Sequence, residues 1–449
     1  MRIIKGFAEA KEAISRGARP QAGVVSPGLA ASLKAMFGTD DPQAAVALII
    51  QEVKFKGDSA LKEYSRKISD VTLEAVEVQR DEMSAACQRI TPELLSAIET
   101  AGKRVKEFHK KQFDAYLQGV RRMSPGTVAR VLERVGLYVP GGTASYPSSV
   151  LMTAIPARAA GVKEVIVCTP PGRDGRIPDI MLAAAYIAGV DRVFAVGGAQ
   201  AIAAMAYGTE SVPAVDKICG PGNIFVMLAK KLVYGSVDID GLQGPSEVLI
   251  IADADANPAW CAADILAQAE HDAMAQSVLV TTSDELASRV MQEVATQTGT
   301  LSRGDVIKES LQGYGLVCIV DNLEQAVELA NRYAPEHLCL YVKHYEDIID
   351  KIHNAGCVFI GDHPTVVMGD YVAGPSHALP TNGTARFASP LNATDFVRLM
   401  NVVTVDDAMM KKYGPVAATL AAAEGLTAHA RAVGDAYDKA RGKKGKGNT

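Results

Sequence analysis

Two polar residues at helical spacing, Gln268 and His271, are the first candidates for chemistry in this chain. They end an apolar-periodic run that begins at Trp260, so a helix there would place the glutamine oxygen and the imidazole nitrogen on one face. Two ligands alone make a weak metal site. Asp370 and His429 would complete a set of nitrogen and oxygen ligands that suits zinc or a similar divalent ion.

A carboxylate and a base lie side by side at Glu336 and His337, directly after Pro335. The proline disfavours the helical region for Ala334, so the pair is expected in a fixed turn at the edge of an element. A neighbouring carboxylate and imidazole can carry out proton transfers in sequence. The pattern therefore predicts a site that combines a metal ion with acid/base catalysis.

The elements that must position these residues follow an α/β pattern. Residues 1–125 show helical periodicity, as in 44–63, with little sign of strands, and are expected to form a helical N-terminal region. Short β-branched runs then alternate with Ala-rich helices in 126–240 and again in 241–380, which is typical of βαβ units on parallel sheets. Two α/β lobes are therefore predicted. Residues 381–449 are expected to begin as a loop and to continue as a helical arm.

The boundary between the lobes is expected at 238–245, where two acids, two glycines and a proline interrupt the pattern. The arm is expected to become helical from Lys411 onward. The expected strands are 164–168, 192–196, 217–219, 248–252, 277–281, 316–320, 338–342 and 357–360, and the expected helices between them are 177–187, 199–207, 223–232, 259–271, 284–297, 323–332 and 345–353.

The composition is that of an ordinary globular protein and argues against two classes of partner. The 449 residues are 48% hydrophobic and 22% charged, with a formal net charge of −5. This balance offers no excess of cations to a phosphate backbone, and no apolar run approaches the roughly 18 residues of a membrane span. We therefore expect neither nucleic acid nor a membrane as partner. The Gly-rich basic tail from Arg441 is expected to be disordered.

Cysteine usage indicates the compartment. The seven cysteines are spread along the chain without a Cys-x-x-Cys pair. Most lie inside apolar runs, such as the one that ends at Cys168, and this is typical of reduced core residues. The N-terminus has no sustained apolar stretch or cleavage site of a secretory signal. The sequence therefore predicts a cytoplasmic protein.

Three glycine motifs fall in the first lobe: Gly136-Leu-Tyr-Val-Pro-Gly-Gly142, Val196-Gly-Gly-Ala-Gln200 and Gly220-Pro-Gly-Asn223. The second and third lie at strand-to-helix junctions, where glycine lets the backbone approach a ligand and free N–H groups attract phosphate. None matches the G-x-G-x-x-G pattern of dinucleotide-binding folds. On glycine content alone, a nucleotide site and tight structural turns stay equally open.

The histidines have to be weighed one by one. His109, His344 and His353 lie on polar faces of expected helices and are predicted to be surface residues. An isolated histidine is more often structural than a ligand. Four others, His271, His337, His377 and His429, become candidates only through their combination with the neighbouring motifs.

Eight motifs stand in the order found in the histidinol dehydrogenase family, which the chain resembles over about residues 20–440. Besides the three glycine motifs, they are Gly244-Pro-Ser-Glu-Val248, Gln268-Ala-Glu-His271, Ala334-Pro-Glu-His-Leu338, Gly369-Asp-Tyr371 and Glu424-Gly-Leu-Thr-Ala-His-Ala430. The resemblance implies two Rossmann-like lobes in an architecture similar to aldehyde dehydrogenases. It also implies NAD-dependent oxidation of L-histidinol to L-histidine through the aldehyde, the last step of histidine biosynthesis.

The resemblance implies roles for individual residues. The zinc ligands would be Gln268, His271, Asp370 and His429. The proton acceptors would be Glu336 and His337, and the NAD contacts Tyr138, Gln200 and Asn223. The substrate contacts would be Ser246, Gln268, His271, His337, Asp370, His377, Glu424 and His429. In the family the C-terminal arm crosses to the other subunit, so a homodimer is implied in which Glu424 and His429 serve the partner's site.

Two other functions stay open. A related zinc- and NAD-dependent dehydrogenase on the same scaffold could act on another polar alcohol, such as a sulfonated diol. Such an enzyme should offer extra cations to the anionic head group, and only Arg386 lies beside the motifs. A non-enzymatic, two-lobed zinc protein would need no Glu336–His337 pair, and closed structural zinc sites usually use cysteine.

Overall fold

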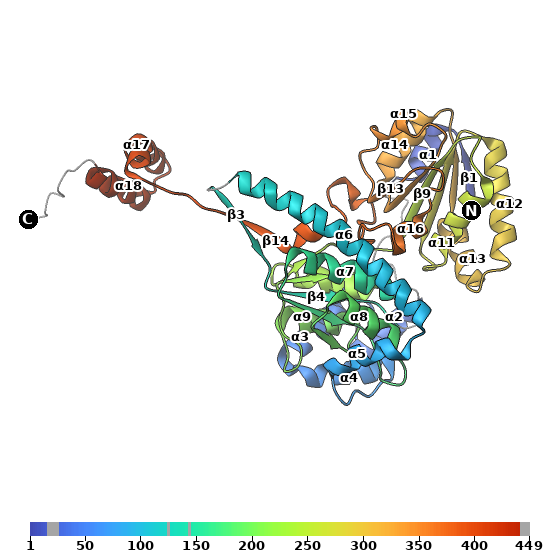
Figure 1. Cartoon of the computed structure of the whole chain (residues 1–449), viewed down its shortest axis with the longest axis horizontal. Coiled ribbons are helices and arrows are strands. Elements are labelled where there is room, and N and C mark those ends of the chain that lie inside the picture. Colours follow the sequence, from blue (N-terminus) through green and yellow to red (C-terminus); the bar gives the residue numbers. More distant parts are fainter. Residues whose placement is uncertain (16–26, 124–125, 142–144, 441–449) are drawn as a thin grey trace, which may run out of the picture. The chain divides into compact units, whose positions relative to one another are not determined.

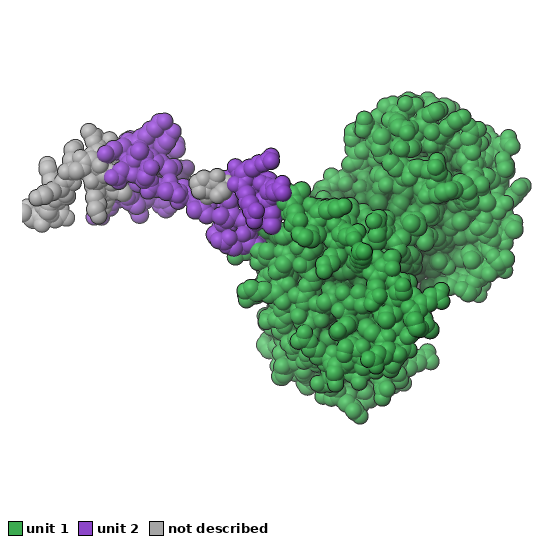
Figure 2. Space-filling view, in the orientation of Figure 1, with its two compact units in different colours: residues 1–116, 131–398 green, residues 117–130, 399–449 purple. Residues whose placement is uncertain are grey.

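The computed structural model of the chain describes residues 1–15, 27–123, 126–141 and 145–440, so Gly142 and the basic tail from Arg441 lie outside the described residues. The chain forms two compact units (Figure 2). Unit 1 comprises residues 1–116 and 131–398, and unit 2 comprises residues 117–130 and 399–449. Both predicted lobes and most of the N-terminal region therefore share unit 1.

Unit 1 contains two six-stranded sheets with the same strand order. Figure 1 labels β4 of one sheet and β9 of the other. The first sheet has the order β2-β6-β5-β4-β7-β8 and the second β1-β11-β10-β9-β12-β13. Apart from the edge strands β2 and β1, each sheet runs third, second, first, fourth, fifth along the chain, which is the order of Rossmann-type folds. The predicted fold class is confirmed.

The strands of the first sheet are β2 (Glu77–Val78), β4 (Arg134–Tyr138), β5 (Glu164–Cys168), β6 (Arg192–Phe194), β7 (Lys217–Cys219) and β8 (Asp238–Ile239). Those of the second are β1 (Arg2–Lys5), β9 (Glu247–Ala252), β10 (Gln276–Thr281), β11 (Leu316–Ile319), β12 (His337–Tyr341) and β13 (Cys357–Phe359). Only β2 pairs antiparallel to its neighbour in these sheets.

Helices cover both faces of the second sheet. Val248 and Ile250 of β9 pack with α11 (Pro258–Ala269), α12 (Asp284–Thr298) and α13 (Gly304–Tyr314). Leu249 and Ile251 pack on the other face with α1 (Phe7–Ala13), α14 (Leu323–Tyr333) and α15 (Glu346–Ile349). Successive side chains of a strand point to opposite faces, so a strand buried on both sides is apolar throughout.

The first sheet is covered in a similar way. On one face, α3 (Pro42–Lys56), α4 (Asp58–Ser69), α9 (Gly198–Tyr207) and α10 (Ile224–Val233) share a core with the strands. The helices α7 (Pro147–Ala160) and α8 (Asp179–Ala188) pack together, and α5 (Arg80–Arg89) packs on α8. The long α6 (Pro92–Arg122) brings Gly102 against α7 and α8. The remaining N-terminal helix is α2 (Pro27–Phe37).

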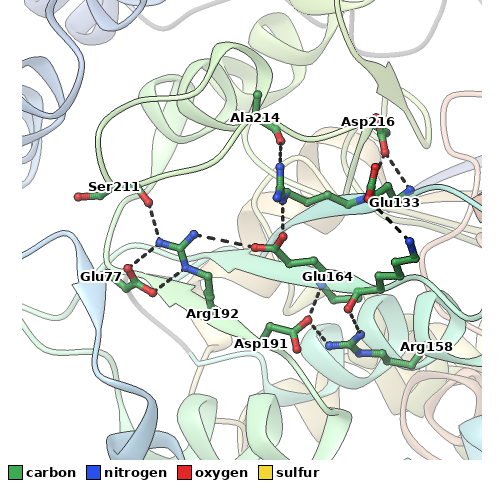
Figure 3. A network of polar contacts seen from close by, with 12 residues as sticks. Glu77, Glu133, Arg158, Glu164, Asp191, Arg192, Ser211, Ala214 and Asp216 are labelled. Carbon is green, nitrogen blue, oxygen red and sulfur yellow. Dashed lines mark hydrogen bonds and ion pairs between the residues drawn. The ribbon is translucent and has the colours of Figure 1, made fainter.

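Arginine–carboxylate pairs fasten the amino ends of the first sheet (Figure 3). Arg134 donates to Glu164 at 2.6 Å, and Arg192 donates to both oxygens of Glu77 at 2.7 Å. Arg134, Glu164 and Arg192 each begin a strand, and Glu77 lies in β2. Arg192 Nη1 also lies 3.9 Å from Glu164 Oε1, so these pairs together connect four strands at the edge opposite to the glycine motifs.

The N-terminal region is mainly helical and contains two short strands that were not predicted. β1 joins the second sheet beside β11, and β2 joins the first sheet beside β6. The periodic stretch 44–63 is not one helix, because Gly57 adopts a φ of 56° and separates α3 from α4. His109, predicted at the surface, is only 1% exposed.

Four further differences concern the second half of the chain. The structure adds α13, which was not predicted, and reduces the expected helix 345–353 to the four residues of α15. The expected loop after residue 380 contains β14 (Val397–Asn401), which pairs with β3 (Thr127–Val131). The arm comprises α17 (Asp407–Ala423) and α18 (Thr427–Ala440), so it begins before Lys411.

Two observations bear on the compartment. All seven cysteines are free, and five of them are buried. No helix within the described ranges is long and apolar enough to cross a membrane.

Candidate active site

The three glycine motifs meet at the carboxyl edge of the first sheet. Tyr138 ends β4 and Gly220 follows the adjacent β7. Gly220 has a φ of 118°, and a Cβ at this position would lie 2.0 Å from the carbonyl oxygen of Tyr138, so only glycine fits. The Tyr138 hydroxyl accepts a hydrogen bond from the Gly198 N–H at 3.2 Å. Tyr138 thus touches both other motifs.

The other two predicted NAD contacts lie at the starts of α9 and α10. Gln200 is 4% exposed, and its Oε1 has no hydrogen-bond partner among the described residues. Asn223 caps α10, because its Oδ1 accepts from the N–H groups of Phe225 at 3.1 Å and Val226 at 3.2 Å. Parallel α/β sheets bind ligands outside the carboxyl ends of the strands where the strand order reverses. β4 and β7 flank that point here.

A buried ion pair holds the third glycine motif. Lys230 of α10 and Asp240, which follows β8, are each 2% exposed and form a salt bridge. Lys230 Nζ also donates to the Gly220 carbonyl at 3.0 Å and to Gln243 Oε1 at 2.8 Å. Asp240 Oδ2 accepts from the Gly220 N–H at 2.7 Å. The loop between the lobes is therefore packed onto Gly220.

The predicted proton acceptors lie at the amino edge of the second sheet. Glu336 directly precedes β12 and His337 begins it, and the two residues are 6% and 5% exposed. Ala334 ends α14 with a φ of 50° and a ψ of 65°, so the predicted turn is confirmed, although Ala334 is left-handed rather than extended. Such a conformation is uncommon for a residue other than glycine.

Both residues are held by the backbone of Glu247, which begins the neighbouring β9. The Glu247 N–H donates to Glu336 Oε2 at 2.8 Å, and the Glu247 carbonyl accepts from His337 Nδ1 at 3.2 Å. A proton on Nδ1 leaves Nε2 as the acceptor of the neutral ring. Nε2 lies 3.6 Å from Asp370 Oδ1.

Burial and neighbouring charges shift the pKa values of this pair. Burial raises the pKa of Glu336 to about 7, against the opposing effects of His337 and of hydrogen bonds from the Glu247 N–H and the Ser246 side chain. Burial alone would lower the pKa of His337, but the Glu336 and Asp370 carboxylates outweigh it and raise that pKa to about 9. A carboxyl group that titrates near neutral pH can both take up and release a proton.

Three of the four predicted metal ligands belong to unit 1. Gln268 is 2% exposed in the last turn of α11, and its Nε2 has no partner among the described residues. The helix ends at Ala269, two residues before the prediction, so His271 lies in the following turn and is exposed. Asp370 lies in α16 (Val366–Tyr371). Burial opposes the effect, but His337, His377 and His271 together lower the pKa of Asp370, so these groups are neighbours.

His377 connects this cluster to the first lobe. Its Nδ1 lies 2.9 Å from the Asp370 carbonyl oxygen, and its Nε2 lies 3.3 Å from Ser149 Oγ of α7. Ser246 is partly buried beside Glu336. The structure therefore brings together Ser246, His271, His337, Asp370 and His377, and Gln268 precedes His271 at the end of α11.

Glu424 and His429 belong to unit 2, where both are exposed. Within the described residues, no group of three or more His, Cys, Asp and Glu side chains is arranged to hold a metal ion. The predicted set has a glutamine as one ligand and draws another from unit 2. It stays a prediction. Zinc would bind the oxygen of Gln268, so the unpartnered Nε2 would stay available as a hydrogen-bond donor.

Two buried acids that support the site, Glu247 and Asp264, were not predicted from the sequence. Glu247 is fully buried, and its Oε1 accepts from the Asn382 N–H at 3.1 Å. Asp264 is 2% exposed on α11. Each is an acid within an otherwise apolar run, and buried acids require partners. This signal was visible in the sequence.

Comparisons with known proteins agree with the resemblance. A family model described as histidinol dehydrogenase matches residues 34–435. A histidinol dehydrogenase of Dehalococcoides mccartyi strain CBDB1 is 55% identical over 433 residues, which cover 96% of this chain and 99% of the relative. One of Aquifex aeolicus is 47% identical over 397 residues, which cover 88% of this chain and 92% of the relative.

A solved structure shows the same fold. The crystal structure of histidinol dehydrogenase from Elizabethkingia anophelis matches with a TM-score of 0.85 and 35% sequence identity, and the match covers 97% of each chain.

Proposed function

The chain belongs to the histidinol dehydrogenase family, and from this we propose that it oxidises L-histidinol to L-histidine through the aldehyde, with NAD as the oxidant. The reaction would be the last step of histidine biosynthesis, in the cytoplasm. One observation carries the proposal: Glu336 and His337 are buried beside Asp370, and the backbone of Glu247 hydrogen-bonds to both of them. Such a pair suits two successive oxidations that each release a proton.

Gln268, His271 and Asp370 would hold zinc together with His429 of the partner subunit. Tyr138, Gln200 and Asn223 would contact NAD. One buried atom without a partner, the acceptor Gln200 Oε1, supports the NAD assignment, because it lies in the proposed NAD site. The oxygen and nitrogen atoms of Gln268, His271 and Asp370 are of the kinds that zinc takes as ligands. When bound, zinc would orient the nitrogen atoms of the substrate and NAD would accept hydride from its carbon.

In its neutral form, His337 Nε2 would accept the proton of the substrate hydroxyl as hydride leaves the alcohol carbon. Because the pKa of His337 is raised to about 9, alkaline pH favours this form. The hydrogen bond from Nδ1 to the Glu247 carbonyl favours the tautomer that this step needs. Glu336 would then take a proton from water, which attacks the aldehyde carbon. Loss of a second hydride from the hydrated carbon gives the carboxylate. The burial of both side chains limits the access of bulk water to the intermediate.

Unit 2 would complete the site of a second subunit in a homodimer. Large apolar side chains are exposed along β14, α17 and the segment between them, among them Leu399, Val403, Tyr413, Val416 and Leu420. Gly414 is the only buried residue of α17. An element that exposes this much apolar surface is expected to pack on another molecule. Glu424 and His429 would then reach the partner's Asp370 and His337.

The test is the stoichiometry of NADH formed per histidine. We expect two NADH for each L-histidinol consumed by the wild-type enzyme. Glu336→Gln should complete the first hydride transfer and then stall, because water is no longer activated, so that a single turnover yields about one NADH. His337→Asn should slow the first step by roughly 10² to 10⁴. An equal loss in both half-reactions of Glu336→Gln would contradict the assigned order, and no NADH from histidinol with wild-type enzyme would refute the proposed activity.

A further inference from the structure

Asp264 is a buried carboxylate that belongs to none of the proposed ligand sets. It lies on α11, one helical turn before Gln268, and it is 2% exposed. A buried carboxylate needs hydrogen-bond donors, because removal from water penalises its charged form. The donors that surround Asp264 come from two other elements.

The first of these elements is α16, which carries Asp370. The Thr365 hydroxyl donates to Asp264 Oδ1 at 2.6 Å, and the same oxygen of Thr365 caps α16 by accepting from the Val367 N–H. The Val366 N–H is a further donor to Asp264. Asp370 follows Val366 by four residues, so it lies one turn along the same helix. Asp264 and Gln268 have the same spacing on α11.

The second element is β12, which begins with His337. The Tyr341 hydroxyl donates to Asp264 Oδ2 at 2.7 Å, and the Cys339 thiol donates to the same carboxylate. His337, Cys339 and Tyr341 alternate along β12 and therefore share one face of the strand. That face packs on α11, since Cys339 and Tyr341 share a core with Ile265 and Leu266.

We propose that Asp264 is a positioning residue that fixes α11, α16 and β12 against one another. Through these three elements it would set the spacing of Gln268, Asp370 and His337. The inference rests on the proposed function, because it concerns the residues assigned to metal and proton transfer. Groups that hydrogen-bond directly to metal ligands commonly change metal affinity by about 10- to 100-fold when they are removed. Asp264 would act one contact further out, through the elements that carry the ligands.

The experiment measures zinc affinity and kinetics in the full-length enzyme. In Asp264→Ala we expect zinc to bind roughly 10- to 100-fold more weakly in competition with a chelator. The visible spectrum of the cobalt-substituted variant should also change, because the ligand geometry is relaxed. At saturating zinc, kcat should stay reduced, since His337 is displaced as well. Asp264→Asn should give a smaller effect, because it keeps one oxygen acceptor.

A matched control separates positioning from general stability. Ser277 is fully buried and donates to the Ile265 carbonyl of the same helix at 3.1 Å, but it connects α11 to β10 instead. Ser277→Ala should lower the melting temperature and leave zinc affinity unchanged. Asp264→Ala protein with wild-type zinc affinity, cobalt spectrum and kcat would overturn the inference.

If Asp264→Ala does not fold, variants of the residues that donate to Asp264 can test the same inference. Tyr341→Phe and Thr365→Val each remove one donor and should each weaken zinc binding by roughly tenfold. Wild-type affinity in both folded variants would likewise overturn the inference. Failure of the proposed function is a separate result, because it would appear in the zinc-loaded wild-type enzyme as no NADH from histidinol.

Discussion

His109 shows how one buried side chain can govern the response of stability to pH. It is 1% exposed, its Nδ1 lies 3.3 Å from Gln112 Oε1, and its Nε2 has no partner among the described residues. Burial lowers its pKa to about 4, against a smaller opposing effect of Gln112. In the unfolded chain the pKa is near 6.5. Between these values the unfolded state binds more protons, so acidification favours unfolding.

We predict that His109→Asn reduces this acid sensitivity, because asparagine can keep the hydrogen bond to Gln112 and has no proton to gain. When the pH is lowered from 6.5 to 4, the free energy of unfolding should decrease in both proteins. The decrease should be larger in the wild type than in the variant, by up to about 3 kcal/mol. Urea titrations at fixed protein concentration would measure the difference. His344→Asn, at an exposed position, is the control and should match the wild type. Parallel pH profiles for His109→Asn and wild type would contradict the prediction.

The error about His109 has a physical cause. The residue has charged and polar neighbours in sequence, but it lies four residues after Val105 and four before Phe113, which are both buried on α6. That spacing places it on the apolar stripe of the helix. Glu336, His337 and Asp370 were foreseen from their motifs, whereas Asp264 has no motif and depends on partners far along the chain.

At the scale of elements, the Lys230–Asp240 pair connects α10, the Gly220 loop and the segment between the lobes. We predict that Lys230→Met destabilises the fold by about 3–5 kcal/mol, because it leaves Asp240 buried without a partner charge. It should also raise the KM for NAD, since the Gly220 loop loses one of its anchors. Urea unfolding and initial rates with varied NAD would test both effects.

The matched control is the double variant Lys230→Met/Asp240→Leu. Replacement of both charges by apolar groups removes the unpaired charge, so the double variant should be more stable than Lys230→Met alone. Its KM for NAD should nevertheless stay raised, because neither the N–H nor the carbonyl of Gly220 regains its partner. A double variant that binds NAD like the wild type would exclude this pair from the support of the NAD loop.

Elements that depend on local periodicity were predicted well, and elements that depend on distant pairing were not. The core strands β9 and β10 were within one residue of their predicted bounds, since a continuous apolar run marks them. The residues of the edge strands β1 and β2 are exposed or half-buried. β1 pairs with β11 in the second half of the chain, and β2 pairs with β6, which follows α6. Cross-strand pairing of this kind leaves no periodic trace in the sequence.

At the scale of the whole molecule, the two sheets have the same strand order, but their predicted site residues lie at opposite edges. In the first sheet, Tyr138 ends β4 and Gly220 directly follows β7, both at the carboxyl edge. In the second, Glu247 and His337 stand at the amino ends of β9 and β12, the corresponding strands. The order of the elements therefore predicted the fold. It did not predict that His337 lies at the amino edge of the second sheet rather than at the carboxyl edge. The amino edge is set by α11, whose last turn carries Gln268 back to the amino ends of the strands.

If unit 2 completes the partner's site, lesions in different units should complement each other. His337→Asn and His429→Asn dimers should each be nearly inactive. After subunit exchange at equal concentrations, about half of the dimers are heterodimers, and each has one site with both lesions and one site with none. Activity should recover to roughly a quarter of wild type by this counting of sites.

The control pairs two lesions that lie in the same unit. In heterodimers of His337→Asn with Glu336→Gln every site carries one lesion, so exchange should restore no activity beyond that of the parents. Glu424→Gln should behave like His429→Asn, because it belongs to the same unit. Native mass spectrometry would confirm that heterodimers have formed. If they have formed and His337→Asn with His429→Asn stays inactive, then His429 serves no site on the partner subunit, and the shared active site is disproved.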